Sequence, residues 1–348
     1  MDFYTSQHKY YCGIDLHAKK MYVCIMNQLG DVLIHKNIPS TPIAFAKIIE
    51  PYKDDLVVSA ECMFTWYWLA DFCADQNIKF VLGHALYMRA IHGGKAKNDR
   101  IDSHKIATIL RGGMLPQAYV YPRKMRSTRD LLRRRTHLVR KKGELQAHVT
   151  NTLSQYNLPP LGSSLKYKMT RETTKGLFKD KSVQRMIDLD VELIGEYKRK
   201  LEAVEDFIER TGKSHDYLSL MILQSIPGVG KILSITILYE IHDINRFPTV
   251  QKFASYSRLV KCKKESAGKV YGSSGNKIGN SNLRWAFAEA ITLMMRTVPE
   301  VKDRVEKLAK KYGKGKAMTI LSHKLGRAVY YMLKRKKYFD LERFTNWN

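Results

Sequence analysis

The spacing of apolar residues in the first third of the chain predicts a sheet flanked by helices. Short apolar runs bounded by turn residues predict five strands, at residues 11–17, 21–26, 32–38, 56–60 and 79–83. Longer runs with helical spacing predict three helices, at residues 42–52, 65–77 and 98–110. The first strands form a meander and the later ones alternate with helices. This order predicts a mixed sheet in an α/β domain over residues 1–122.

The middle of the chain predicts a long helical arm. Within a helix expected over residues 182–211, isoleucine or leucine recurs every seven residues, at Ile187, Ile194, Leu201 and Ile208. This apolar seam can pack against the helix expected to begin near residue 123, or it can join two chains, and the sequence leaves both possibilities open. We therefore expect a basic, helical, coiled-coil arm over residues 123–213.

The last part of the chain, residues 214–348, predicts a mainly helical domain with two distinctive segments. Residues 226–230 read Ile-Pro-Gly-Val-Gly between two apolar helices. This is the turn of a helix-hairpin-helix element, where a phosphate can approach the next helix N-terminus, although a purely structural turn is the alternative. A glycine-rich loop is expected at residues 265–280, and long loops in compact domains are usually functional. The hydroxyls of Ser266, Ser273, Ser274 and Ser281 are candidate nucleophiles or phosphate donors, and the residues alone single out none of them.

The charge of the chain favours a polyanionic partner. Lys and Arg number 60 against 33 Asp and Glu, a formal net charge of +27. No apolar run approaches the ~20 residues of a membrane-spanning helix, and the N-terminus lacks the pattern of a signal peptide. The five cysteines are scattered and form no Cys-x-x-Cys pair, which favours a reducing cytoplasm over disulfides or structural zinc.

Basic residues concentrate in segments that predict contacts with nucleic acid. Residues 123–142 contain ten Lys or Arg and one acid, Asp130, so the predicted helix has a dense positive surface. The glycine turn and the glycine-rich loop add further candidates. The predicted contacts are Arg123, Lys124, Arg133, Arg134, Arg135, Arg140, Lys141, Gly228, Val229, Gly230, Lys269, Lys277 and Arg284.

Four carboxylates in the first domain predict a metal site. Asp99 and Asp102 are three residues apart at the start of a helix, so both project from one face. Asp15 lies within the first strand and Glu61 follows the fourth, where an unpaired charge among buried neighbours is costly. A solvated helix start and an Asp15 bonded to backbone amides are the structural alternatives. The four together favour a pair of Mg²⁺ ions that assists phosphoryl transfer.

These motifs, in this order, resemble the bridge-RNA-guided insertion-sequence transposases related to the Piv and MooV invertases. Residues 12–17, Cys-Gly-Ile-Asp-Leu-His, resemble the first catalytic strand of that family's RuvC-like domain, which has a ribonuclease H fold. Residues 97–102, Lys-Asn-Asp-Arg-Ile-Asp, are similar to its Lys-x-Asp-Arg-x-Asp signature. Residues 226–230 and 282–286 resemble its C-terminal transposase domain, so the resemblance covers nearly the whole chain.

The resemblance implies a DNA recombinase with a serine nucleophile. Ser266 occupies the position of that serine and would form a phosphoserine link to DNA. Ala267 stands where the family has glycine, so Ser273 and Ser274 remain alternatives. A non-coding guide RNA would select donor and target DNA, and the protein would act as a homo-oligomer, a dimer or a tetramer. Magnesium would be held by Asp15, Glu61, Asp99 and Asp102.

The residues also leave two other functions open. A junction-resolving nuclease would use the same carboxylates with water as the nucleophile and would release free DNA ends. A non-catalytic nucleic-acid scaffold would carry the carboxylates as structural groups, and their replacement would leave every activity unchanged.

Overall fold

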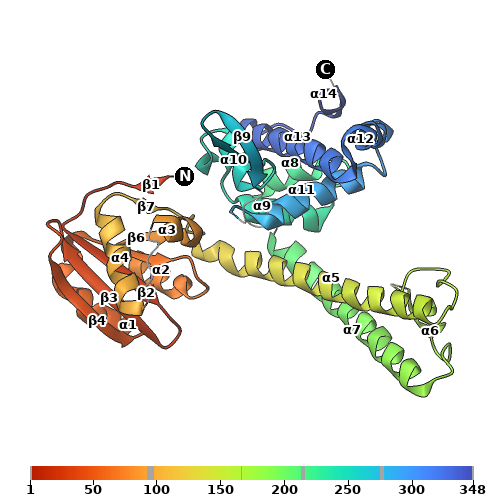
Figure 1. Ribbon diagram of the computed structural model, residues 1–348, viewed down its shortest axis with the longest axis horizontal. Helices are drawn as coiled ribbons and strands as arrows, with labels where there is room; N and C mark the ends of the chain where they lie inside the picture. The colour runs from red at the N-terminus through yellow and green to blue at the C-terminus, as the bar shows by residue number, and fades with distance from the viewer. Residues whose placement is uncertain (1, 92–97, 166, 213–215, 275–277, 347–348) are drawn as a thin grey trace. The chain divides into compact units, whose positions relative to one another are not determined.

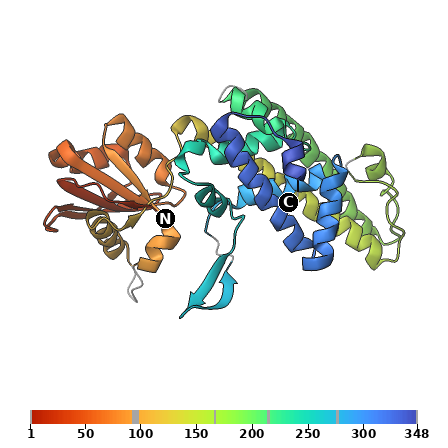
Figure 2. The same ribbon diagram turned by 90° about the horizontal axis from the view of Figure 1, so that it is seen from above.

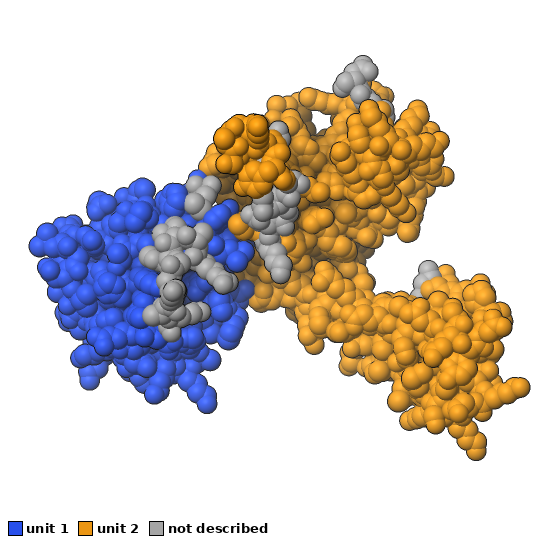
Figure 3. All heavy atoms as spheres, in the orientation of Figure 1, with its two compact units in different colours: residues 1–124 blue, residues 125–348 orange. Residues whose placement is uncertain are grey.

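The chain folds into two compact units, residues 1–124 and residues 125–348 (Figure 3). The structure is a computed structural model, and each unit is described by itself. The described residues are 2–91, 98–165, 167–212, 216–274 and 278–346. Among the helices of these ranges, none combines the length and the apolar character that crossing a lipid bilayer requires.

Unit 1 contains the predicted mixed sheet. Its strands are β2 (Tyr10–Leu16), β3 (Lys20–Asn27), β4 (Val32–Pro39), β5 (Leu56–Glu61) and β6 (Lys79–Gly83). Their spatial order is β4-β3-β2-β5-β6, in which β2, β3 and β4 pair antiparallel and β2, β5 and β6 pair parallel. The α/β prediction is thus confirmed, and the sheet is compatible with a ribonuclease H-like fold. A short pair, β1 (Phe3–Tyr4) with β7 (Leu115–Pro116), was not predicted.

Helices cover both faces of this sheet (Figure 1). The helices of unit 1 are α1 (Pro42–Ile49), α2 (Trp66–Asp75), α3 (Ala85–Ile91) and α4 (Asp99–Arg111), with a 3₁₀ turn at Glu50–Asp55. Side chains alternate between the faces of a strand, and β2 follows this rule. Cys12 and Ile14 are buried with Phe45 of α1 and Leu69 of α2. Tyr11 is buried on the other face, in the cluster that contains residues of α4.

Two long helices of unit 2 lie antiparallel to each other. They are α5 (Arg123–Gln155) and α7 (Lys181–Gly212), with the short α6 (Lys168–Glu172) between them (Figure 1). Ion pairs join them at two levels, His148 with Asp190 and Arg135 with Glu205. The four residues of the seven-residue repeat are all buried, and two of them, Ile187 and Ile194, pack with residues of α5. The helices therefore pair within one chain.

The rest of unit 2 is a helical domain with one β-hairpin. Its helices are α8 (Tyr217–Gln224), α9 (Lys231–Ile241), α10 (Val250–Tyr256), α11 (Ser281–Met294), α12 (Pro299–Tyr312), α13 (Lys314–Arg335) and α14 (Leu341–Thr345), with a 3₁₀ turn at Ile244–Arg246. Their apolar faces form one core around Phe253 and Phe287, both fully buried. The expected glycine-rich loop begins instead as a hairpin of β8 (Cys262–Ser266) and β9 (Lys269–Ser274) that extends away from the helices (Figure 2).

The turn between α8 and α9 packs tightly against α11. Gly228 has φ +81°, and a Cβ at this position would lie 2.7 Å from the backbone nitrogen of Met294. Val229 is buried in the same core. Gly230 differs, because no atom lies near its Cβ direction and it precedes the first turn of α9. Gly228 is thus required by packing, and Gly230 is the open position of the turn.

Replacing Gly228 by alanine is expected to destabilise unit 2. The new methyl group meets backbone atoms and the positive φ disfavours an L side chain, so the free energy of unfolding should fall by about 2–4 kcal/mol. Chemical denaturation measures this change. Gly230→Ser is the matched control, with φ −77° and open space, and should change stability by less than about 0.5 kcal/mol. Equal losses in both variants would contradict the packing assignment.

Candidate active site

The pairing of two parallel strands places Asp15 and Glu61 side by side. Ile14 of β2 pairs with Ala60 of β5, and the next residue on each strand is Asp15 or Glu61. Both residues follow the strand alternation onto the face that carries α4. Adjacent strands lie about 4.8 Å apart, so the two carboxylates begin from neighbouring backbone positions.

A glycine lets α4 lie directly on β2. A Cβ on Gly13 would be 2.3 Å from the backbone nitrogen of Ala107 and 2.4 Å from the carbonyl oxygen of Ser103. Gly13 points to the same face as Asp15, two residues away. The first turn of α4 therefore lies beside Asp15.

The first turn of α4 is fixed by its cap. The Asn98 side chain accepts a hydrogen bond from the backbone nitrogen of Ile101 at 2.8 Å. Asp99 and Asp102 follow within that turn, where the positive end of the helix dipole favours negative charge. The predicted start of this helix at residue 98 thus agrees with the cap. Lys97 of the same motif lies outside the described residues.

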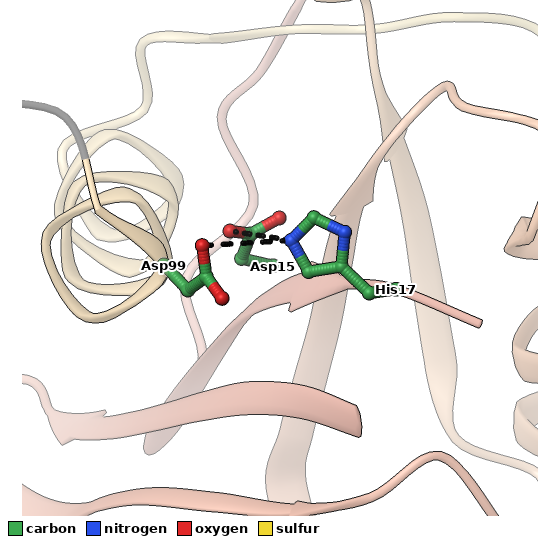
Figure 4. Close-up of side chains that lie close together, drawn as sticks. All are labelled: Asp15, His17 and Asp99. Carbon is green, nitrogen blue, oxygen red and sulfur yellow. Dashed lines mark ion pairs between the residues drawn. The ribbon is translucent and has the colours of Figure 1, made fainter. Parts of the chain in front are cut away.

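Three side chains converge at this point, Asp15, His17 and Asp99 (Figure 4). The His17 Nε2 atom lies 3.4 Å from Asp15 Oδ2 and 3.6 Å from Asp99 Oδ1. One ligand atom from each residue falls within 4.8 Å of the other two. Asp15 is the most enclosed, with its side chain 19% exposed against 58% for His17 and 57% for Asp99.

The electrostatics of this cluster suit a cation. Burial raises the pKa of the Asp15 carboxyl, His17 opposes that shift, and the charges of Asp99 and Asp102 raise it further. Asp102 acts on Asp15 through its charge but is not part of the three-residue cluster. A divalent ion would relieve the repulsion, because carboxylate oxygens are the ligands that Mg²⁺ prefers. The residues present therefore fit a divalent metal.

His17 is the member of the cluster that sequence reasoning missed as a ligand. His17 directly follows β2, two residues after Asp15, so a continuation of the strand alternation places both side chains on one face. That spacing was the available signal. Glu61 is half-buried at the end of β5 and makes other interactions, and it is not part of the three-residue cluster.

The predicted nucleophile, Ser266, lies at the tip of the β8–β9 hairpin. It is exposed and pairs with Lys269 across a two-residue turn. The turn residues, Ala267 with φ 48° and Gly268 with φ 74°, both have positive φ, as a type I′ turn requires. Ala267 is thus the strained member of the turn. The side chains of the alternative serines at 273 and 274, like Lys277, lie outside the described residues.

The predicted basic contacts divide into two groups. Four arginine or lysine residues have acidic partners: Arg123 with Asp71 and Asp75, Arg133 with Glu240, Arg135 with Glu205, and Lys141 with Glu144. The other described ones are exposed: Lys124, Arg134, Arg140, Lys269 and Arg284. Arg123 and Lys141 are also exposed, so among the described contacts only Arg133 and Arg135 are half-buried as well as paired.

Comparisons with known proteins connect both regions to one class of enzyme. A family model described as "Transposase", for the DEDD domain of IS110 elements, matches residues 12–158. A second, described as "Transposase IS116/IS110/IS902 family", matches residues 220–306. The first range contains all four predicted carboxylates, and the second contains the 226–230 turn and the hairpin of Ser266.

A relative along nearly the full length gives the same result. The transposase for insertion sequence element IS1111A of Coxiella burnetii (strain RSA 493 / Nine Mile phase I) is 20% identical over 339 residues, which cover 93% of this chain and 90% of that protein. The fold, the acidic cluster and these matches define a transposase, an enzyme that cleaves and joins DNA. More closely, the chain belongs to the IS110 family of transposases, which confirms the predicted class.

Replacing Asp15 by asparagine is expected to stabilise the metal-free protein. The raised pKa means that ionised Asp15 is disfavoured in the folded state. This penalty is complete above the folded-state pKa and disappears as the pH falls below the unfolded-state value. In EDTA at pH 7 the melting temperature should rise by a few degrees, and the gain should shrink in acid. Mg²⁺ should then stabilise the wild type more than the variant.

The matched control for this measurement is Asp54→Asn, an exposed acid elsewhere in unit 1. It should leave the melting temperature unchanged in both conditions. A lower melting temperature for Asp15→Asn in EDTA would contradict the repulsive cluster and would favour a structural Asp15.

Proposed function

We propose that this transposase cuts and rejoins DNA through a phosphoserine intermediate on Ser266, with Mg²⁺ held by the acidic cluster and with target choice made by a non-coding guide RNA. The observation that carries the proposal is the convergence of Asp15 and Asp99, from a strand and a helix far apart in sequence, to within ligand distance. Repelling carboxylates gathered on one face are typical of a metal-assisted phosphoryl-transfer site.

The residues proposed to hold magnesium are Asp15, Glu61, Asp99 and Asp102. When bound, the metal would neutralise charge on the scissile phosphate and stabilise the leaving oxygen. The protein's own contribution is to fix the carboxylates before DNA arrives, through the Gly13 contact and the Asn98 cap. His17 contacts two of the acids and can orient them.

The proposed covalent step conserves the energy of the phosphodiester bond. The Ser266 oxygen attacks phosphorus, the serine loses its proton, and the bond to one deoxyribose oxygen breaks as that oxygen gains a proton. The phosphoserine link can then be attacked by the hydroxyl of another DNA end, so strands are rejoined without ATP. An exposed hydroxyl at a hairpin tip suits this role, because the DNA backbone can reach it.

The positive charge supports nucleic acid as the partner and suits a guide RNA as well as DNA. The excess of 60 basic over 33 acidic residues is spread along the chain, and phosphate contacts supply affinity without reading sequence. Base pairing by a guide RNA would then supply the specificity. We also propose a dimer or tetramer, in which the α5–α7 arm contributes to assembly.

Replacing Ser266 by alanine is expected to abolish covalent protein–DNA adducts. The variant loses only the attacking oxygen, so DNA and RNA binding should keep their wild-type affinity. Denaturing gel electrophoresis of labelled DNA measures the adduct, and mobility shift measures binding. Ser273→Ala and Ser274→Ala are the matched controls and should form adducts normally. Wild-type cleavage with free DNA ends and no adduct would instead favour a water-using nuclease.

The double change Asp15→Asn and Asp102→Asn is expected to stop DNA cleavage. A metal held by these carboxylates would supply several kcal/mol of transition-state stabilisation, so the cleavage rate should fall by about a thousandfold or more. EDTA should have the same effect on the wild type and excess Mg²⁺ should reverse it. Asp54→Asn serves as the control acid. Unchanged cleavage in the double variant would favour structural carboxylates.

A further inference from the structure

We propose that Glu240 and Asn280 form a positioning pair for the transposase, which holds the base of the hairpin that carries Ser266. The proposal rests on the proposed role of Ser266. Neither residue was a candidate in the sequence, and both lie outside the acidic cluster of unit 1. Their side chains instead meet inside unit 2, where α5, α9 and the start of α11 come together.

Glu240 is a buried acid with three partners from two other elements. Its side chain is 1% exposed. Arg133 Nε donates to one carboxylate oxygen at 2.7 Å, and Arg133 Nη2 and Arg129 Nε donate to the other at 3.0 and 3.1 Å. Asn280 Nδ2 completes the set, donating to Glu240 Oε2 at 2.7 Å. The carboxylate therefore connects α5 to Asn280, the residue that follows the hairpin and precedes α11.

The charge on Glu240 is maintained by these partners. Burial by itself would raise the pKa of this carboxyl, but the hydrogen bond from Arg133, the charges of Arg129 and Arg133, and the hydrogen bond from Asn280 lower it below its usual value. Burying an ion pair is a poor source of stability compared with an apolar core. The four hydrogen bonds are better explained by a positioning role, in which Glu240 fixes where Arg129, Arg133 and Asn280 lie.

Asn280 uses every part of its side chain and backbone to hold the segment. Its Oδ1 accepts from the backbone nitrogens of Asn282 and Leu283, at 2.9 and 3.1 Å, and so caps α11. Its backbone nitrogen donates to the Tyr256 carbonyl at 2.6 Å. The Nδ2 bond to Glu240 is thus separable from the cap, because the two functions use different atoms.

The two ends of the hairpin segment leave the core at the same place. Arg258, which follows α10, donates from Nε to the carbonyl oxygens of Ile278 and Gly279 at 3.1 and 2.9 Å. Gly279 has φ +97°, and a Cβ there would lie 2.6 Å from the Tyr256 carbonyl oxygen. A displacement of Asn280 would therefore disturb the place where residues 256–258 and 278–280, on either side of the hairpin, are bonded to each other.

The variant Asn280→Ser separates positioning from folding. Serine also caps helices well, so α11 keeps its cap, but the shorter side chain gives up the amide donor to Glu240. We expect the rate of adduct formation at saturating DNA to fall about tenfold, the factor for one lost hydrogen bond to a charged group. The DNA concentration at half-saturation should stay at its wild-type value, and the assay is run well below the melting temperature, which should fall by a few degrees because the fold loses the same hydrogen bond.

The matched control is Asp340→Ser, which exchanges one cap for another at α14, away from the network. It should form adducts at the wild-type rate. Equal rates in Asn280→Ser and the wild type would overturn the positioning role, and so would a loss of DNA affinity that accounts for the whole fall in rate. If the wild type itself forms no adduct, the proposed function of Ser266 fails first, so the two failures are distinguishable.

Discussion

The contact of α4 with β2 at Gly13 is the constraint on which the acidic cluster depends. Helix backbone atoms lie where any larger side chain would put its Cβ. This approach brings the helix start, with Asp99 and Asp102, against the strand that carries Asp15. A side chain at position 13 would hold the helix away from the sheet, and the carboxylates would separate.

The cluster stores electrostatic repulsion that the fold tolerates. The carboxyl of Asp15 is enclosed and faces two further acids, with His17 as the partner that offsets part of the cost. Functional sites often keep such locally unfavourable arrangements because the ligand or the transition state relieves them. Here the relief would come from a divalent cation together with a phosphate, which is consistent with an enzyme that cleaves and joins DNA.

Unit 2 contains a buried charged residue, Glu240, within a mainly apolar core. Apolar contacts are non-directional, so the apolar core does not by itself fix where the segments next to it lie. Glu240 supplies direction, because hydrogen bonds from Arg129, Arg133 and Asn280 are satisfied in one arrangement only. Both units thus use polar groups at sites where geometry matters, and apolar packing elsewhere.

The sequence by itself determined the strands of the sheet, the helix that begins at the Asn98 cap and the buried seven-residue repeat of α7, since these depend on local periodicity and capping. Family motifs also identified the class of enzyme. Only the tertiary structure decided that Asp15 and Glu61 lie at one level of parallel strands, that His17 joins the acids, and that Glu240 reaches Asn280. These pairs are distant in sequence, and no local pattern specifies which distant side chains meet.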